Sequence, residues 1–216
     1  IPCVGGKVSL YNETSDGPIK PTPVIGVIGL IDKKPLKIQK INSGDSLIMV
    51  GDTKDELGGS EYSEYIHKFI GGKCPAVDFS ESKKNMNSVL DAIENELIKS
   101  AHDCSKGGLS IAISELCMIN QIGCNISLEK IPGEKLDSDK ILFSESHSRY
   151  LLTIENKNLS KLEETMKKHN VSYSLIGEFT GDSICFTGDS KPIIDLSVDK
   201  AQKTWYNSLK EMVLHA

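Results

Sequence analysis

The sequence between residues 46 and 214 alternates between two apolar periodicities, and this alternation constrains the fold more than any other feature. Helical spacing of apolar residues predicts amphipathic helices at residues 87–101, 108–121 and 199–214, and a short charged helix at 159–169. Short apolar runs predict strands at residues 46–51, 124–128, 149–154, 172–176 and 183–186. Because helices and strands interleave without an internal repeat, we expect a mixed α/β (α+β) layered domain.

Two details of these helices are specific enough to test. Asn87 or Ser88 is the expected N-cap of the first helix, because short polar side chains at that position accept hydrogen bonds from the first free amides. The last helix is expected to bury one apolar face. That face consists of Ala201, Trp205, Leu209, Met212 and Val213.

A second domain is indicated upstream of this region. The run from Thr22 to Ile31 is β-branched and punctuated by glycines, which predicts a strand that is either buried on both faces or a tightly packed edge near another backbone. The lysine-rich stretch that follows reads as a connector, and Gly44 precedes the next strand. We therefore place a boundary near residues 38 to 45, with residues 1–43 as the remnant of one domain and 44–216 as another.

The paired glycines Gly5 and Gly6 lie almost at the start of the sequence, followed by Lys7 and Ser9. Glycine amides can approach an anion closely, while a lysine supplies charge and a serine a hydroxyl group. The alternative is a simple glycine turn with Lys7 solvated, since the pattern matches no standard phosphate-binding motif. Such a loop needs partners from its own domain, so we expect the chain to be the C-terminal part of a larger protein.

Composition excludes several classes of function. The net charge is -5 and the 25 Lys and Arg residues are scattered, which argues against a nucleic-acid partner. The longest apolar stretch is residues 24–31, far short of the roughly 20 residues that a membrane helix needs. The six cysteines lack CxxC spacing, so we expect reduced thiols, a cytoplasmic location and no structural zinc.

The segment from His102 to Leu109 is a candidate anion and metal site between two helices. Asp103 offers a carboxylate to Mg²⁺, and Ser105 precedes the Gly107 and Gly108 amides, where a helix N-terminus would attract phosphate. The alternative is that Asp103 or Ser105 only caps the following helix. His102 and Cys104 are not expected to form a catalytic Cys–His pair.

Two further loops have polar patterns of lower specificity. The loop at residues 142–149 contains Glu145, His147 and Arg149, and we expect an exposed approach to a strand with His147 on the surface. The glycines at positions 58 and 59 predict a turn before a short helix, where Glu61 would be a first-turn carboxylate favoured by the helix dipole.

Taken together, these motifs resemble the PurL-type large subunits of phosphoribosylformylglycinamidine synthase. The wider superfamily includes aminoimidazole ribonucleotide synthetase, selenophosphate synthetase and hydrogenase maturation proteins. The resemblance rests on five segments in the same order, Gly5-Gly-Lys-Val-Ser-Leu-Tyr-Asn-Glu-Thr14, Pro21-Thr-Pro-Val-Ile-Gly-Val-Ile-Gly29, Leu57-Gly-Gly-Ser-Glu-Tyr62, Asp103-Cys-Ser-Lys-Gly-Gly-Leu109 and Phe143-Ser-Glu-Ser146.

The resemblance implies a PurM C-terminal-like layered domain preceded by the last strands of an N-type, ATP-binding domain. It also implies a carbon–nitrogen ligase that uses ATP and Mg²⁺ to convert formylglycinamide ribonucleotide to the amidine in purine biosynthesis. Ammonia would come from glutamine through a glutaminase subunit, alongside a small PurS-type subunit. The general base of the family is a histidine of the first N-type domain, so we expect no catalytic residue in this chain and no activity from it alone.

Site residues follow from the resemblance position by position. Gly6 matches a backbone contact to nucleotide, and Ser9 matches a substrate contact. Asp103 and Ser105 match a Mg²⁺ ligand and a nucleotide contact of a second, auxiliary site. Lys7 stands where short forms carry a metal-binding asparagine, and because an ammonium group cannot ligate Mg²⁺, phosphate contact is expected instead.

Two alternatives remain open at this stage. One is a non-catalytic domain that holds a structural nucleotide. The other is a different superfamily member, such as a selenophosphate-synthetase-like kinase.

Overall fold

The computed structural model describes residues 2–19, 22–31 and 40–214, apart from the side chains of residues 209–212. The chain divides into two compact units, Ile1–Pro35 and Leu36–Ala216. Most of the predicted lysine-rich connector lies outside the described residues. The predicted domain boundary between residues 43 and 44 remains a prediction.

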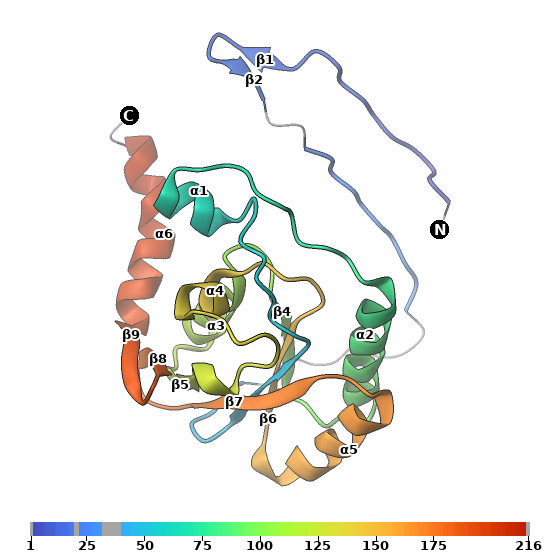
Figure 1. Cartoon of the computed structure of the whole chain (residues 1–216), viewed down its shortest axis with the longest axis vertical. Helices are drawn as coiled ribbons and strands as arrows, with labels where there is room; N and C mark the ends of the chain where they lie inside the picture. Colours follow the sequence, from blue (N-terminus) through green and yellow to red (C-terminus); the bar gives the residue numbers. More distant parts are fainter. Residues whose placement is uncertain (1, 20–21, 32–39, 215–216) are drawn as a thin grey trace. The chain divides into compact units, whose positions relative to one another are not determined.

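A seven-stranded mixed sheet forms the centre of the second unit (Figure 1). Its spatial order is β4-β6-β3-β7-β5-β8-β9, and every neighbouring pair is antiparallel except β5 and β8. The strands are β3 (Ser46–Val50), β4 (Ser100–Asp103), β5 (Cys124–Ser127), β6 (Tyr150–Ile154), β7 (Tyr173–Phe179), β8 (Ser183–Gly188) and β9 (Lys191–Ser197).

Helices cover both faces of this sheet, and the alternation along β3 shows how the faces are divided. Ile48 and Val50 pack into a cluster with α2 and α5, whereas Leu47 and Met49 pack into a larger cluster with α3, α4 and α6. The helices are α1 (Glu61–His67), α2 (Phe79–Glu94), α3 (Gly108–Asn120), α4 (Ser138–Phe143), α5 (Leu159–His169) and α6 (Val198–Leu214), with short 3-10 turns at Leu128–Lys130 and Asn156–Asn158. The predicted mixed α/β class is confirmed.

Helix α2 begins and ends earlier than predicted. Its N-cap is Asp78, whose side chain accepts hydrogen bonds from the amides of Ser80 and Glu81, so neither Asn87 nor Ser88 is a cap. The helix stops at Glu94, and Glu96 takes a left-handed conformation with φ 54°. Leu97 and Ile98, which the sequence pattern places in the helix, lie in the connection to β4, and the strand itself begins at Ser100.

The other predicted elements agree more closely with the structure. Helix α5 has the predicted bounds, α3 ends one residue earlier than predicted, and α6 starts one residue earlier. The apolar face of α6 is buried only near its start, since Ala201 packs on the core while Trp205 is 54% exposed and Val213 is 69% exposed. The side chains of Leu209 and Met212 lie outside the described residues. Strand β9 was not predicted.

The predicted strand at residues 22–31 is wrong. These residues carry no strand, and Val24, Ile28 and Leu30 are at least 93% exposed. A strand needs a hydrogen-bonded neighbour, and in the described part of this unit the one ladder pairs β1 (Glu13–Thr14) with β2 (Gly17–Pro18). The expected last strands of an N-type domain are therefore not formed by these residues.

The cysteines are free thiols, as expected. Cys104, Cys117 and Cys124 are buried, Cys185 is half-buried, and Cys3 is exposed like Cys74. Within the described ranges, no helix is both long enough and apolar enough to cross a membrane.

Candidate functional site

The predicted Asp103 and Ser105 lie together where β4 ends. Strand pleating turns His102 the other way, where its Nε2 atom lies 2.9 Å from Oε2 of Glu115 on α3. The Ser105 hydroxyl donates to Oδ2 of Asp103 at 2.6 Å, and this bond is the main reason that the pKa of Asp103 is lowered. The carboxylate is exposed and ionised at neutral pH, as a metal ligand must be.

Neither side chain caps the helix that follows. The N-cap of α3 is Gly107, which has no side chain to supply a capping bond, and the Ser105 hydroxyl is directed to Asp103. The capping alternative for these two side chains is therefore wrong, and both remain available to a ligand.

The two glycines are required by packing, and their amides do not face a ligand. Gly107 and Gly108 both have positive φ, and a Cβ on Gly108 would lie 2.5 Å from the carbonyl oxygen of Ser144. The Gly107 amide donates to Oε1 of Glu145 at 2.9 Å, and the Gly108 amide donates to the Ser105 carbonyl. The expectation that these amides cradle a phosphate is wrong in this structure, because an internal carboxylate occupies the position.

Replacing Gly108 with alanine is expected to lower the free energy of unfolding by roughly 2–4 kcal/mol, from left-handed strain plus the clash with the backbone of residue 144. Gly181→Ala is the matched control, because Gly181 has φ +65° but nothing within 4 Å of an added Cβ. The control should lose only about 1 kcal/mol. Urea unfolding of the two variants measures the difference, and equal losses would contradict the packing argument.

The segment Ser144–Ser146 is largely buried and is hydrogen-bonded to residues 54–56. Ser144 and Ser146 are buried, and their hydroxyls accept hydrogen bonds from the amides of Glu56 and Lys54. The predicted exposed loop is therefore wrong at these positions, although His147 is exposed as expected. The structure was needed to see this, because the partners lie about 90 residues earlier in the chain.

Glu145 connects α1 to α3 through one carboxylate oxygen. Its Oε1 atom accepts the Gly107 amide at 2.9 Å and the Glu61 amide at 3.0 Å. Glu61 begins α1, as predicted for a first-turn carboxylate, and its side chain also lies 2.7 Å from the Lys106 ammonium. The loop that carries Ser105 is thus held against α1 from both sides.

A cavity of about 250 Å³ opens beside these residues and is called the Asp103 cavity below. Cys104 on its wall is a poor nucleophile, because burial raises the pKa of its thiol to about 11. This agrees with the exclusion of a catalytic Cys–His pair. The lining residues are Val77, Ser82, Asp103, Cys104, Ser105, His147, Ser148, Arg149 and Tyr150.

The residues around Asp103 fit a Mg²⁺ ion that takes a single carboxylate ligand from the protein. Among the described residues, no group of three or more His, Cys, Asp or Glu side chains could hold a metal. Asp103 is a single ionised carboxylate, which suits a Mg²⁺ ion that keeps water and phosphate oxygens as its other ligands.

The structure does not bring a site together around the opening glycines. In the first unit, Gly6, Lys7 and Ser9 are all exposed, and nothing lies within 4 Å of a Cβ built on Gly6. Their roles in nucleotide, phosphate and substrate contact remain predictions.

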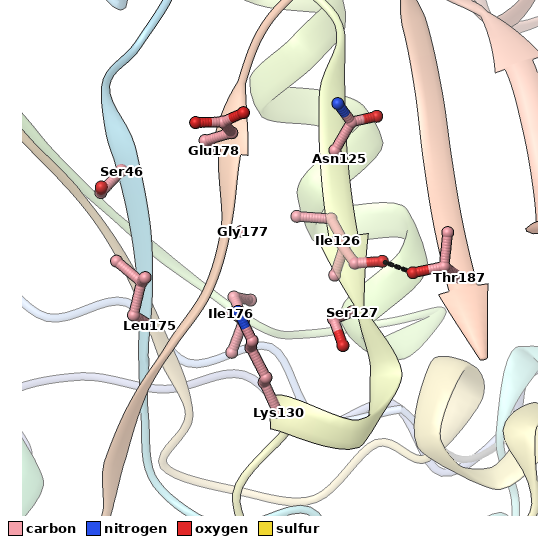
Figure 2. Close-up of a pocket in the computed structure, with 10 residues that line it drawn as sticks. All are labelled: Ser46, Asn125, Ile126, Ser127, Lys130, Leu175, Ile176, Gly177, Glu178 and Thr187. Atoms are coloured by element: carbon pink, nitrogen blue, oxygen red, sulfur yellow. Dashed lines mark hydrogen bonds between the residues drawn. The ribbon is translucent and has the colours of Figure 1, made fainter. Parts of the chain in front are cut away.

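A second cavity, of about 280 Å³, lies on the sheet where β5, β7 and β8 run side by side (Figure 2). Lys130 and Glu178 are among its lining residues, and the Thr187 hydroxyl donates to the Ile126 carbonyl at 3.1 Å. None of the site residues predicted from the sequence lines this cavity.

The sequence pattern of a family described as AIR synthase related protein, C-terminal domain, matches residues 42–187. The chain belongs to this family. In sequence order the match runs from β3 into β8, and it includes both Asp103 and the segment Ser144–Ser146.

Several curated relatives of this AIR synthase-related chain are PurL subunits. The phosphoribosylformylglycinamidine synthase subunit PurL of Methanocaldococcus jannaschii is 36% identical over 221 residues, covering 99% of this chain and 30% of the relative. The PurL subunit of Alkaliphilus metalliredigens is 34% identical over 211 residues, covering 97% of this chain and 28% of the relative. The resemblance to PurL-type subunits is confirmed, and the chain spans about a third or less of the length of these relatives.

Solved structures agree on the fold. T. maritima PurL complexed with FGAR superposes with a TM-score of 0.70 at 19% identity, covering 77% of this chain and 29% of that chain. The hydrogenase maturation protein HypE of E. coli superposes with a TM-score of 0.54 at 16% identity, covering 77% and 52%. The AIR synthase-related fold is thus shared with proteins of different description.

Proposed function

We propose that this chain acts as the second C-type domain of a PurL-type subunit of phosphoribosylformylglycinamidine synthase. The observation that carries the proposal is the 36% identity to a PurL subunit over 99% of the chain. The reaction would be the ATP-dependent conversion of formylglycinamide ribonucleotide to formylglycinamidine ribonucleotide. Residues 44–216 would form this domain, and residues 1–43 would belong to the preceding N-type domain.

Other parts of the proposal follow from the same relationship. A glutaminase subunit would supply ammonia from glutamine, with a small PurS-type subunit in the same complex and a cytoplasmic location. T. maritima PurL has been crystallised with FGAR and with ATP, and a structure of PurLQS exists, which supports these ligands and partners by analogy.

Within this assembly we assign the Asp103 cavity to a Mg²⁺–nucleotide. Asp103 would ligate the metal, and the Ser105 hydroxyl would turn toward a phosphate oxygen when the metal takes over the carboxylate. Bound Mg²⁺ would neutralise phosphate charge. Because Glu145 already holds the Gly107 amide, the phosphates would be met by side chains rather than by the N-terminus of α3.

Replacing Asp103 with alanine in the natural full-length protein is expected to weaken binding of Mg²⁺ with an ATP analogue at this site at least about tenfold, because the carboxylate charge is lost. Equilibrium dialysis measures the change. Asp195→Ala is the control, since this exposed carboxylate lies on the edge strand β9. Unchanged nucleotide binding by the Asp103 variant would refute the assignment of the cavity.

The same variant separates the proposed enzyme domain from a domain that only holds a structural nucleotide. Ammonia-dependent turnover of formylglycinamide ribonucleotide decides between them. Lost turnover in a folded protein supports a role in the reaction, and normal turnover with lost nucleotide supports the structural role. The isolated chain is expected to show no turnover.

A further inference from the structure

Arg149 is unusual both for its residue type in this sequence and for its burial. Of the 25 Lys and Arg residues in the sequence, Arg149 is the one arginine. It is also the largest fully buried side chain of the described residues, with 1% of its surface exposed. Burial lowers the pKa of its guanidinium, which nevertheless stays charged at neutral pH.

The guanidinium group makes three hydrogen bonds, all to neutral acceptors. Nε donates to the Ser146 carbonyl at 3.0 Å, and Nη2 donates to the Ser144 carbonyl at 2.5 Å. Nη1 donates to the Thr53 hydroxyl at 3.1 Å. In the described part of the chain no carboxylate lies within ion-pair distance of Arg149, although Glu56 and Glu145 are near enough to favour its charge.

A buried cation without a paired carboxylate is a costly way to fill a core. An apolar side chain of similar volume is often neutral or stabilising in such a position. Filling space therefore does not account for an arginine here. What distinguishes arginine from the lysines used elsewhere is its planar fork, which reaches several acceptors in fixed directions.

Arg149 itself lines the Asp103 cavity, whereas the acceptors of its fork lie outside the lining. The Ser144 and Ser146 carbonyls flank Glu145, whose carboxylate holds the Gly107 amide beyond the Ser105 loop. The main-chain carbonyl of Arg149 accepts the Cys104 amide at 3.0 Å, which fixes the chain between Asp103 and Ser105. The Arg149 side chain therefore acts on the Ser105 loop by way of Glu145, while the main chain of Arg149 holds the end of β4.

We propose that Arg149 is a positioning residue for the Asp103 cavity, and that the site requires its forked hydrogen bonding rather than its charge. This inference rests on the proposed binding of Mg²⁺–nucleotide at Asp103. The Arg149 side chain acts through the Ser105 loop that it holds by way of Glu145, so its replacement displaces the ligands without removing any of them.

The test uses the natural full-length protein and Mg²⁺ with the non-hydrolysable ATP analogue AMPPCP as the probe. Binding is measured for wild type, Arg149→Lys, Arg149→Met, Asp103→Ala and the control Lys161→Met, which removes an exposed charge from α5. The binding that is lost in Asp103→Ala is taken as binding at the Asp103 cavity. The dissociation constant of this component is then compared between the variants. Circular dichroism and thermal unfolding report whether each variant is folded.

Both Arg149 variants are expected to raise the dissociation constant of this component at least about tenfold, and Lys161→Met should leave it unchanged. Wild-type affinity in Arg149→Lys would mean that charge suffices, which overturns the inference. Wild-type affinity in both variants with a lower melting temperature would show a purely structural role, which also overturns it. If Arg149→Met does not fold, Arg149→Lys and Thr53→Val, which removes one acceptor, carry the same test.

The proposed function fails in a different way. If wild type does not bind the probe, or if Asp103→Ala binds it as wild type does, the nucleotide site itself is refuted and the inference about Arg149 falls with it. If Asp103→Ala loses binding and the Arg149 variants do not, only the inference is refuted.

Discussion

Replacing Lys99 with methionine is expected to lower the free energy of unfolding by about 3–5 kcal/mol, because it leaves the buried Asp45 carboxylate without its cation. The Lys99 ammonium lies 2.7 Å from Oδ2 of Asp45, and each side chain is 7% exposed. The same Asp45 oxygen accepts the amide of Asn42, so the carboxylate also holds the turn before β3. Urea unfolding followed by circular dichroism measures the loss.

A double variant provides the matched control for this pair. Lys99→Met combined with Asp45→Asn removes both charges, and a buried pair replaced by neutral groups is often nearly as stable as the original. The double variant should therefore recover most of the loss. If it is as unstable as Lys99→Met alone, the destabilisation comes from lost packing and the electrostatic explanation is wrong.

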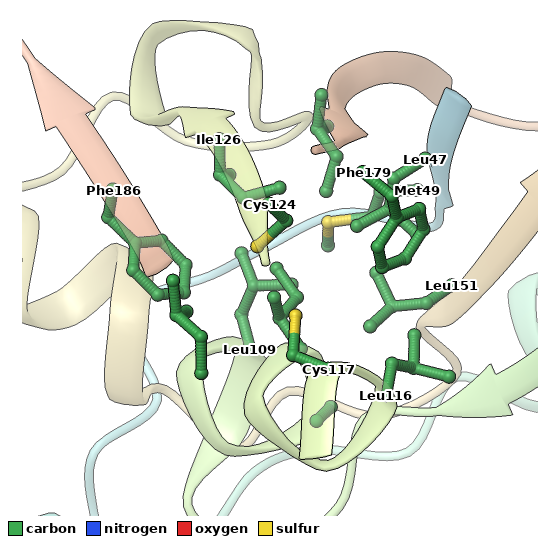
Figure 3. Close-up of a cluster of buried hydrophobic side chains, with 14 of the residues drawn as sticks. Leu47, Met49, Leu109, Leu116, Cys117, Cys124, Ile126, Leu151, Phe179 and Phe186 are labelled. Carbon is green, nitrogen blue, oxygen red and sulfur yellow. The ribbon is translucent and has the colours of Figure 1, made fainter. Parts of the chain in front are cut away.

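Replacing Phe179 with alanine is expected to lower the free energy of unfolding by about 3–5 kcal/mol, since it removes a large side chain from the larger core cluster. Phe179 is 0% exposed and packs among Leu47, Met49 and Leu151 in the cluster that joins the sheet to α3 (Figure 3). The Ser105 loop leads directly into α3. The space left by Phe179→Ala should therefore also loosen the Asp103 site.

Phe79→Ala is the chemically identical control at an exposed position. Phe79 is the first residue of α2 and is 82% exposed, so its truncation should change the stability by no more than about 0.5 kcal/mol. The two urea midpoints measured side by side isolate the effect of burial. Equal shifts would contradict the assignment of Phe179 to the core.

Elements with clear periodicity and clear ends could be predicted from the sequence. Helices α3 and α5 end where Gln121 and Asn170 adopt left-handed conformations, and such breaks coincide with the loss of apolar spacing. Helix α2 was misplaced because apolar residues continue past its end. Leu97 and Ile98 are buried in the same cluster as α2, so burial continues although the backbone has changed conformation.

The site could be predicted only in part, for a physical reason. Asp103 and Ser105 are two residues apart, so their contact follows from local geometry. The occupation of the Gly107 amide by Glu145 joins positions 38 residues apart, and Arg149 reaches Thr53 across 96 residues. Local patterns contain no information on such distant contacts. The sequence indicates a polar motif around Glu145, but only the fold shows which amides its carboxylate accepts.

The central position of β3 has a consequence for how this domain acquires its structure. The strand is the first of the sheet in sequence, yet its two neighbours are β6 and β7, which begin at Tyr150 and Tyr173. During synthesis, about 100 further residues must follow β3 before either of its edges can be paired. Folding therefore depends on late, long-range closure, which makes it slow and leaves an early strand open to misassociation until the second half of the chain emerges.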